Sequence, residues 1–153
     1  MKIEEKINEL GYTLPEAPKP VAAYIPTVRT GNLIFTAGQI PIVEGKLEYT
    51  GKIYDEKTIQ KGFEAARICA LNCLSVIKSE IGDLDKIKKI VKIGVFVNSA
   101  EKFTDQPKVA NGASELLVEI FGEKGKHARS AVGVNELPLN AAVEIEMIVE
   151  VED

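Results

Sequence analysis

Two stretches of the chain alternate between hydrophobic and other residues, the pattern of a β-strand with one buried face. They are KKIVKIGVFVNS, residues 88–99, and AVEIEMIVEV, residues 142–151. Because successive side chains of a strand point to opposite faces, every second residue is expected to face the interior. The expected inner residues are Val91, Ile93, Val95 and Val97 in the first strand, and Val143, Ile145, Met147, Val149 and Val151 in the second.

Two further stretches carry hydrophobic residues at steps of three and four, which predicts amphipathic helices over residues 58–81 and 107–121. Thr58 or Asp55 is suited to cap the start of the longer helix, and Gly82 to end it. The shorter helix begins at a proline, which fits the first turn because its missing N–H costs no hydrogen bond there. The expected buried stripes are Phe63, Ala66, Ala70, Leu74, Ile77 and Ile81, and Val109, Ala113, Leu116, Leu117 and Ile120.

The chain starts with a segment of a different kind, over residues 1–20. A short amphipathic helix is expected up to Gly11, followed by a proline-rich connector, since the four prolines of TLPEAPKPVAAYIP favour extended backbone. GNLIFTAGQIP then predicts a turn and a strand over residues 33–36, with Gly38 marking a bulge or a close approach. A further strand is expected over residues 129–134, joined to the last strand through NELPLN.

Together these elements predict the α+β class: a mixed β-sheet with two helices packed on one face, in one domain spanning residues 1–153. The uncovered face of the sheet is expected to carry Phe96, Ile148 and either Leu33 or Ile34. A partly apolar sheet face often contacts another subunit, so the pattern supports oligomerisation as a hypothesis.

Composition narrows the function classes. Of 153 residues, 45% are hydrophobic and the net charge is −4, which disfavours nucleic-acid binding because phosphate contacts need clustered lysine and arginine. No apolar run approaches the ~20 residues that span a membrane, and MKIEEKINEL does not resemble a signal peptide, so a cytoplasmic protein is expected. Cys69 and Cys73 lie on one helix face, where two reduced thiols without a metal are the expectation.

A few scattered residues could carry chemistry: Tyr24, Gly38, Asn111, His127, Arg129 and Glu144. Each also has an ordinary explanation. Arg129 could be salt-bridged at a strand edge, Glu144 could be a solvated strand residue, and His127 could be a hydrogen-bonded edge residue. Tyr24 could serve packing, and Asn111 could shape a turn. Ala131 and Gly133 share a strand face with Arg129 and are expected to leave room in front of it.

The chain resembles the RidA/YjgF family of reactive-intermediate deaminases, also called the endoribonuclease L-PSP or translation-inhibitor family. The resemblance covers most of residues 20–151. It rests on AAYIPTVRTGNLIFTAGQIP, on VFVNSAEKF and on HARSAVGVNELPLNAAVEIEMIVEV. The tract VANGASELLVEIFGEKGKHARSAVGV is similar to the longer branch of the family rather than to the short deaminase branch.

The resemblance implies a trimeric, chorismate mutase-like fold with ligand clefts between neighbouring subunits. Its deaminases hydrolyse enamines and imines of 2-keto acids without cofactor or metal. The arginine that grips the substrate carboxylate falls on Arg129, and the glutamate that places the hydrolytic water falls on Glu144. The tyrosine and the asparagine of the pocket fall on Tyr24 and Asn111, and His127 is a candidate to line it. Independently of the resemblance, backbone groups at the Gly38 loop could complete the pocket, because glycine allows close approach.

Two positions depart from the short branch, which has serine before its Gly-Gln pair and cysteine two residues after the arginine. Here they are Ala37 and Ala131. The first change removes a hydroxyl that could touch the substrate and puts the substrate range in question.

The register of the last two strands is a separate question. If these strands form a simple hairpin, a slip of one residue decides whether Arg129 and Glu144 share a face.

Three functions follow, in order of preference. The first is hydrolytic deamination of small imine or enamine acids by a homotrimer, with Arg129 and Glu144 as the catalytic pair. The second is a non-catalytic trimer that binds small carboxylates as a sensor or carrier. The third, ribonuclease activity or translation inhibition, is disfavoured because the chain is acidic and has no lysine and arginine cluster.

Overall fold

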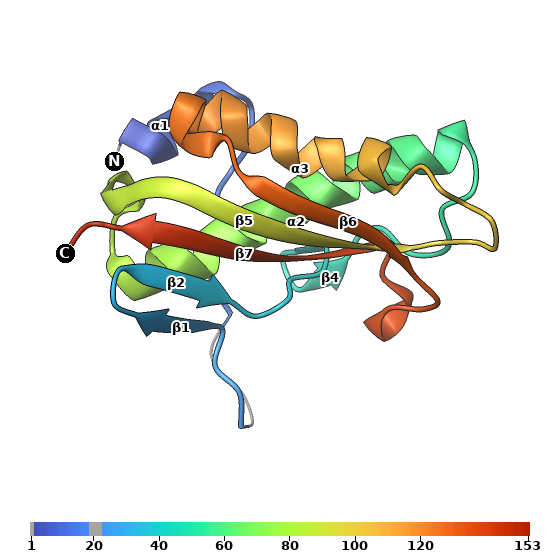
Figure 1. Ribbon diagram of the computed structural model, residues 1–153, viewed down its shortest axis with the longest axis horizontal. Coiled ribbons are helices and arrows are strands. Elements are labelled where there is room, and N and C mark those ends of the chain that lie inside the picture. Colours follow the sequence, from blue (N-terminus) through green and yellow to red (C-terminus); the bar gives the residue numbers. More distant parts are fainter. Residues whose placement is uncertain (1, 19–22) are drawn as a thin grey trace.

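The computed structural model describes residues 2–18 and 23–153, and part of the proline-rich connector, residues 19–22, lies outside the described residues. The elements are α1 (Lys2–Glu9), β1 (Thr27–Thr30), β2 (Leu33–Thr36), β3 (Ile42–Val43), β4 (Lys46–Leu47), α2 (Glu56–Ile81), β5 (Ile87–Asn98), α3 (Gln106–Phe121), β6 (Ala128–Val134) and β7 (Val143–Val151) (Figure 1). Short 3-10 turns follow α2, α3 and β6, at Leu84–Lys86, Gly122–Gly125 and Pro138–Asn140.

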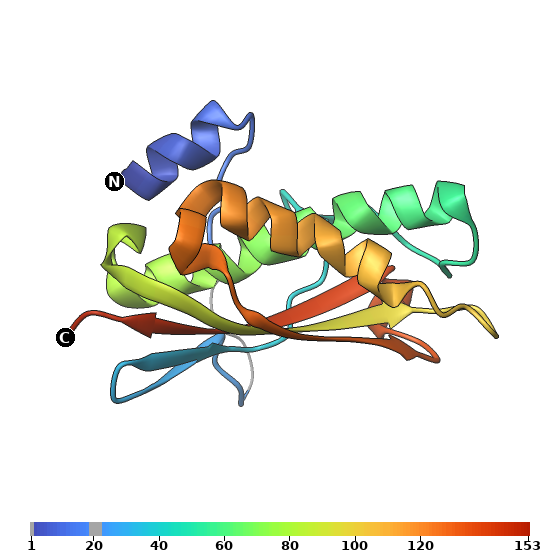
Figure 2. The same cartoon turned by 45° about the horizontal axis from the view of Figure 1, so that its top comes forward.

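Five strands form one sheet in the order β1-β2-β7-β5-β6, and β3 and β4 form a separate hairpin. Neighbouring strands of the sheet are antiparallel except for β5 and β6, which are parallel. Helices α2 and α3 lie on one face of the sheet, and α1 lies beyond α3 (Figure 2). The predicted α+β class with both long helices on one face is therefore confirmed.

Strand β5 lies between β7 and the edge strand β6, so it separates the last two strands of the chain. β6 pairs with one edge of β5 and β7 with the other, so β6 and β7 do not form a hairpin. The segment between them crosses the end of β5 through the turn Pro138–Asn140, where Leu139 and Asn140 both have positive φ angles. The register of the two strands is therefore set through β5.

Helix α2 begins and ends where its sequence predicts. The Asp55 side chain accepts the backbone N–H of Thr58, and the Thr58 hydroxyl accepts the backbone N–H of Asp55, so the two alternatives for the cap act together as a capping box. Gly82 closes the helix with a φ of 85° and donates its N–H to the carbonyl of Lys78. The positive φ explains why glycine stands at this position.

The hydrophobic core lies between the helices and the sheet. All predicted inner residues of β7 are buried, and so are both helical stripes except Phe63, which is partly exposed. In β5 the prediction for Val91 was wrong: Ile90 is fully buried and Val91 only partly. The pairing of β5 with β7 shifts between Ile90 and Lys92, and such a bulge resets the alternation by one residue.

Helices α2 and α3 cross at a glycine. A Cβ atom at Gly112 would stand 2.1 Å from the backbone oxygen of Phe63, so only glycine allows this approach. Gly62 is also close to α3, but there a Cβ atom would meet the side-chain tip of Val109 at 2.9 Å. A side-chain tip can move aside, whereas a helix backbone cannot without moving the whole helix.

Gly112→Ala is therefore expected to destabilise the fold far more than Gly62→Ala. We expect a loss of about 2–3 kcal/mol for Gly112→Ala and less than about 1 kcal/mol for Gly62→Ala, since overpacking a core costs on this order and alanine itself favours helix. Urea unfolding of the two variants and the wild type measures both values. Equal stability of the two variants would contradict the close crossing.

The N-terminal helix α1 is attached to the rest of the chain by specific contacts. The backbone N–H groups of Lys2 and Ile3 donate to the Asp85 carboxylate, at 2.9 Å each, and Glu4 forms a salt bridge with Lys78 of α2. Ile7 is fully buried. The helix is thus capped by a residue that follows α2 and is fixed to the core through its one apolar side.

The sheet face away from the helices is exposed and partly apolar. Val28 is 54% exposed, Phe35 38% and Val132 45%, and the partly buried Phe96 and Ile148 also lie on this face. Of the two alternatives from the sequence, Leu33 lies on this face, while Ile34 is fully buried on the helix side.

The two cysteines of α2 are buried, free thiols under the sheet. The Cys69 and Cys73 sulfur atoms lie 3.6 and 3.4 Å from the carbonyl oxygens of Val143 and Ile145. Burial raises the pKa of Cys73 to about 12, and it also raises the pKa of Cys69. Both are packing residues. Within residues 2–18 and 23–153, no group of three or more potential metal ligands comes together, and no helix is long and apolar enough to cross a membrane.

Candidate functional site

Arg129 lies on β6 and reaches across to α3. Its Nη1 atom donates to the Asn111 side-chain oxygen at 2.8 Å and to the Ser114 hydroxyl at 3.1 Å. Asn111 and Ser114 are three residues apart on α3, and this spacing puts both side chains on the same face of the helix. The structure thus brings into contact Asn111 and Arg129, which the resemblance assigns to one pocket, and it adds Ser114.

His127 extends this cluster from the other side of Ser114. Its Nε2 atom lies 2.9 Å from the Ser114 hydroxyl, and its Nδ1 atom lies 2.6 Å from the carbonyl oxygen of Gly125. A carbonyl oxygen only accepts, so Nδ1 carries the proton of the neutral ring and Nε2 accepts from Ser114. His127 is therefore part of the Arg129 cluster, through Ser114.

The partners of Arg129 are all neutral. Among the described residues, no carboxylate pairs with its guanidinium, and only Nη1 has hydrogen-bond partners. The side chain is partly buried, so it retains a positive charge that no acid of the described chain neutralises. Its planar fork is suited to a carboxylate, which it can bind with two parallel hydrogen bonds.

The small residues beside Arg129 have another role than expected. A Cβ atom at Gly133 would stand 2.6 Å from the Gln106 side-chain nitrogen and 2.7 Å from the Ser99 hydroxyl, and Ala131 packs against the core. The prediction that Ala131 and Gly133 leave open room was therefore wrong at Gly133. The small residue there lets the first turn of α3 lie close to the sheet.

Glu144 lies on the opposite face of the sheet, against Gly38. A Cβ atom at residue 38 would stand 2.6 Å from the Glu144 carboxylate, so the predicted close approach at Gly38 is confirmed and its partner is Glu144. Burial raises the pKa of the Glu144 carboxyl, and the nearby Glu146 carboxylate raises it further. Gly94 similarly makes space for Glu146, whose Cγ atom lies 3.2 Å from the position of a Cβ atom there.

The register explains why one chain does not bring Arg129 and Glu144 together. Arg129 pairs with Ile93 of β5, whereas Glu144 pairs with Phe96. Directly paired residues share a face, and positions that differ by an odd number point to opposite faces. Three positions correspond to about 10 Å along the strand.

Tyr24 contacts neither the Arg129 cluster nor Glu144. It lies in the loop before β1, and its side chain is 62% exposed.

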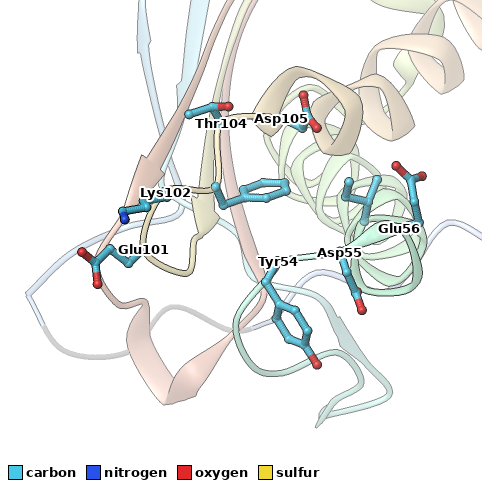
Figure 3. Close-up of a pocket in the computed structure, with 9 residues that line it drawn as sticks. Tyr54, Asp55, Glu56, Glu101, Lys102, Thr104 and Asp105 are labelled. Atoms are coloured by element: carbon cyan, nitrogen blue, oxygen red, sulfur yellow. The ribbon is translucent and has the colours of Figure 1, made fainter.

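A separate hollow of about 450 Å³ lies where α2 and α3 begin (Figure 3). Its lining includes none of the predicted site residues. Most of its charged groups are acidic, and Asp55 among them already caps α2. An anionic ligand would be repelled here, so this hollow does not compete with Arg129 as a carboxylate site.

The sequence over residues 4–151 matches the family model described as "YjgF/chorismate mutase-like, putative endoribonuclease". The chain belongs to this family. Protein TCP17 of Trypanosoma cruzi is 43% identical over 150 residues, which cover 97% of this chain and 94% of that protein. A RidA/YjgF relative of Dermatophagoides farinae named 2-iminobutanoate/2-iminopropanoate deaminase is 34% identical and covers 90% of this chain and 93% of its own.

Solved structures of the RidA/YjgF family have the same fold. The crystal structure of Atu1372 from Agrobacterium tumefaciens, a protein described as of unknown function, superposes with a TM-score of 0.91. It is 42% identical and covers 99% of this chain and 93% of that one. The family assignment expected from the motifs is therefore confirmed, whereas the roles of individual residues remain predictions.

Proposed function

We propose that the protein hydrolyses small imines or enamines of 2-keto acids to the keto acid and ammonia. The observation that carries this proposal is the Arg129 guanidinium, which is partly buried, held through Nη1 by neutral oxygen atoms and not paired with any carboxylate of the described residues. Such a group suits the carboxylate of a small acid. The deaminase name of the Dermatophagoides farinae relative supports the reaction class.

Arg129 binds the substrate carboxylate in this proposal, and Glu144 orients and deprotonates the attacking water. The carbon of a protonated imine is already electrophilic, so the reaction needs a positioned water molecule and a base but no strong nucleophile and no cofactor. A carboxyl group whose pKa is raised by burial is a better base than an ordinary glutamate. Tyr24 and Gly38 are proposed to complete the pocket around the substrate.

The proposal requires an assembly of more than one chain, because Arg129 and Glu144 lie on opposite faces of one chain, and the assembly proposed is the homotrimer that the family resemblance implies. A cleft between neighbouring subunits joins the Arg129 cluster of one chain to the Glu144 side of another. Two observations support this assembly: the sheet face with Glu144 is open, and it carries the exposed apolar residues Val28, Phe35 and Val132. An apolar face of this kind is stabilised by contact with another subunit.

The direct test is hydrolysis of 2-iminopropanoate, generated in the assay and followed by the release of keto acid and ammonia. We expect the purified protein to accelerate the reaction well above its spontaneous rate, and size-exclusion chromatography with light scattering to give the mass of three chains. Hydrolysis at the spontaneous rate would contradict the proposed activity.

A second candidate is a sensor or carrier that binds small carboxylates without turnover. It is favoured by one observation: the Arg129 cluster is complete within one chain, while hydrolysis also needs Glu144 from the other face. Ala37 and Ala131, which replace a serine and a cysteine of the short branch, are compatible with it. A keto acid that raises the melting temperature in the absence of any turnover would favour this candidate. The description "putative endoribonuclease" names a third, which RNA cleavage dependent on Arg129 would support.

A further inference from the structure

A continuous chain of hydrogen bonds runs through the Arg129 cluster, and the chemistry of its two ends fixes its direction. Arg129 can only donate, so the Ser114 oxygen accepts from Nη1 and its own proton is directed to Nε2 of His127. At the far end, the Gly125 carbonyl accepts from Nδ1, so in the neutral ring Nε2 is the acceptor. This is the arrangement of a hydroxyl poised to pass its proton to a base.

We propose that Ser114 and His127 form a proton relay for the ligand bound at Arg129. The inference rests on the proposed function and deepens it. Ser114 Oγ lies 3.1 Å from Nη1 of Arg129, and the relay requires that a small acid held by the guanidinium places its reacting carbon next to this hydroxyl. His127 is the only histidine of the chain, and histidine is the side chain best suited to take up and release a proton near neutral pH.

The relay serves the second half of the reaction, when the water adduct collapses. In that adduct one carbon carries a hydroxyl group and a protonated amine, since Glu144 has passed the proton taken from the attacking water on to the nitrogen. The hydroxyl gives its proton to Ser114 Oγ while the proton of Ser114 passes to Nε2 of His127. The O–H electron pair then forms the C=O bond, and the C–N electron pair leaves with the nitrogen as ammonia. The imidazolium returns its proton to water, so atoms and charges balance.

A purely structural role makes a different prediction. If Ser114 and His127 only hold Arg129 in place, their loss weakens substrate binding and raises KM. If they relay protons, their loss lowers kcat while the carboxylate still binds. Glutamine at residue 127 separates the two cases, because its amide oxygen can accept a hydrogen bond from Ser114 but cannot take up the proton.

The test is steady-state kinetics of 2-iminopropanoate hydrolysis by the intact assembled protein and four variants. For Ser114→Ala and His127→Gln we expect kcat to fall by about 10²-fold, a usual share for one proton-transfer group, and KM to change by less than about threefold. Ser114→Thr, which keeps a hydroxyl, is expected to retain most of the activity. Ser79→Ala, an exposed serine near the end of α2, is the matched control and is expected to behave as the wild type.

A fifth variant, His127→Ala, adds a test that distinguishes a proton relay from a purely structural role. Added imidazole is expected to restore part of its kcat, because the free base replaces the missing one. A kcat of His127→Gln within twofold of the wild type, or a rise in KM alone, would overturn the relay while leaving the proposed hydrolysis intact. A wild type without turnover would instead overturn the proposed function, and the relay with it.

Discussion

Arg129→Lys is expected to lower kcat/KM for 2-iminopropanoate by about 10- to 100-fold, and Arg129→Ala by about 10²- to 10³-fold. Lysine keeps the charge but replaces a planar fork by a single ammonium group, so the carboxylate loses one of two parallel hydrogen bonds. A hydrogen bond to a charged group contributes about 1.5–3 kcal/mol, and each 1.4 kcal/mol corresponds to a factor of ten. Alanine removes both bonds and the charge.

The same two variants test carboxylate binding without turnover. We expect the melting temperature of the wild type to rise with millimolar 2-oxobutanoate, a product analogue, and the rise to be lost in Arg129→Ala. Arg29→Lys is the control, because Arg29 is an exposed arginine of β1 that donates to backbone carbonyls of Gly31 and Glu152. Equal activity of Arg129→Lys and the wild type would contradict the binding of the substrate carboxylate by two parallel hydrogen bonds from Arg129.

The fold follows from the sequence to a large extent because it depends on periodicity and on local capping groups. The alternation of β7, the stripes of α2 and α3 apart from Phe63, and the capping residues Asp55 and Gly82 lie where the pattern predicts. The failure at Val91 has a local cause that composition does not reveal. A bulge in β5 changes the phase of the alternation, and its position depends on how β7 pairs with that strand.

The candidate site was only partly predictable, for a reason of topology. The family motifs assign Arg129 and Asn111 to one pocket but do not predict their contact, and the i, i+3 spacing from Asn111 could have identified Ser114 as a neighbour. The opposite facing of Arg129 and Glu144 could not be inferred, because it depends on the placement of β5 between their strands. Gly133 shows the same limit: a small residue indicates close approach, but the sequence does not say that the approaching group is Gln106.

Glu144→Gln is expected to have two opposite effects: hydrolysis falls by about 10²-fold or more, while the fold becomes more stable at neutral pH. The loss of activity follows because glutamine cannot accept the proton of water. The gain in stability follows from the raised pKa of Glu144, which results first from burial and then from Glu146. An ionised carboxylate in this position is less favourable in the folded than in the unfolded chain, and glutamine has no such charge.

The sign of the pH dependence follows from proton linkage. With its pKa raised in the folded state, Glu144 binds more protons folded than unfolded, so its contribution to the unfolding free energy falls as the pH rises from the ordinary value of 4.5 through the raised value. The melting temperatures of Glu144→Gln and the wild type should therefore agree most closely near pH 4 and diverge by pH 7, with the variant higher.

Thermal unfolding at pH 4 and at pH 7 measures this difference, and Glu119→Gln, at an exposed position of α3, is the control that should show no such divergence. An NMR titration of the Glu144 carboxyl adds an observation independent of activity, since Glu146→Gln is expected to lower the pKa of Glu144 by removing the neighbouring negative charge. If Glu144→Gln were less stable than the wild type at pH 7, the carboxylate would be stabilising the fold rather than being held there at a cost. That result would remove the physical argument that Glu144 occupies this position because it acts as a base in the reaction.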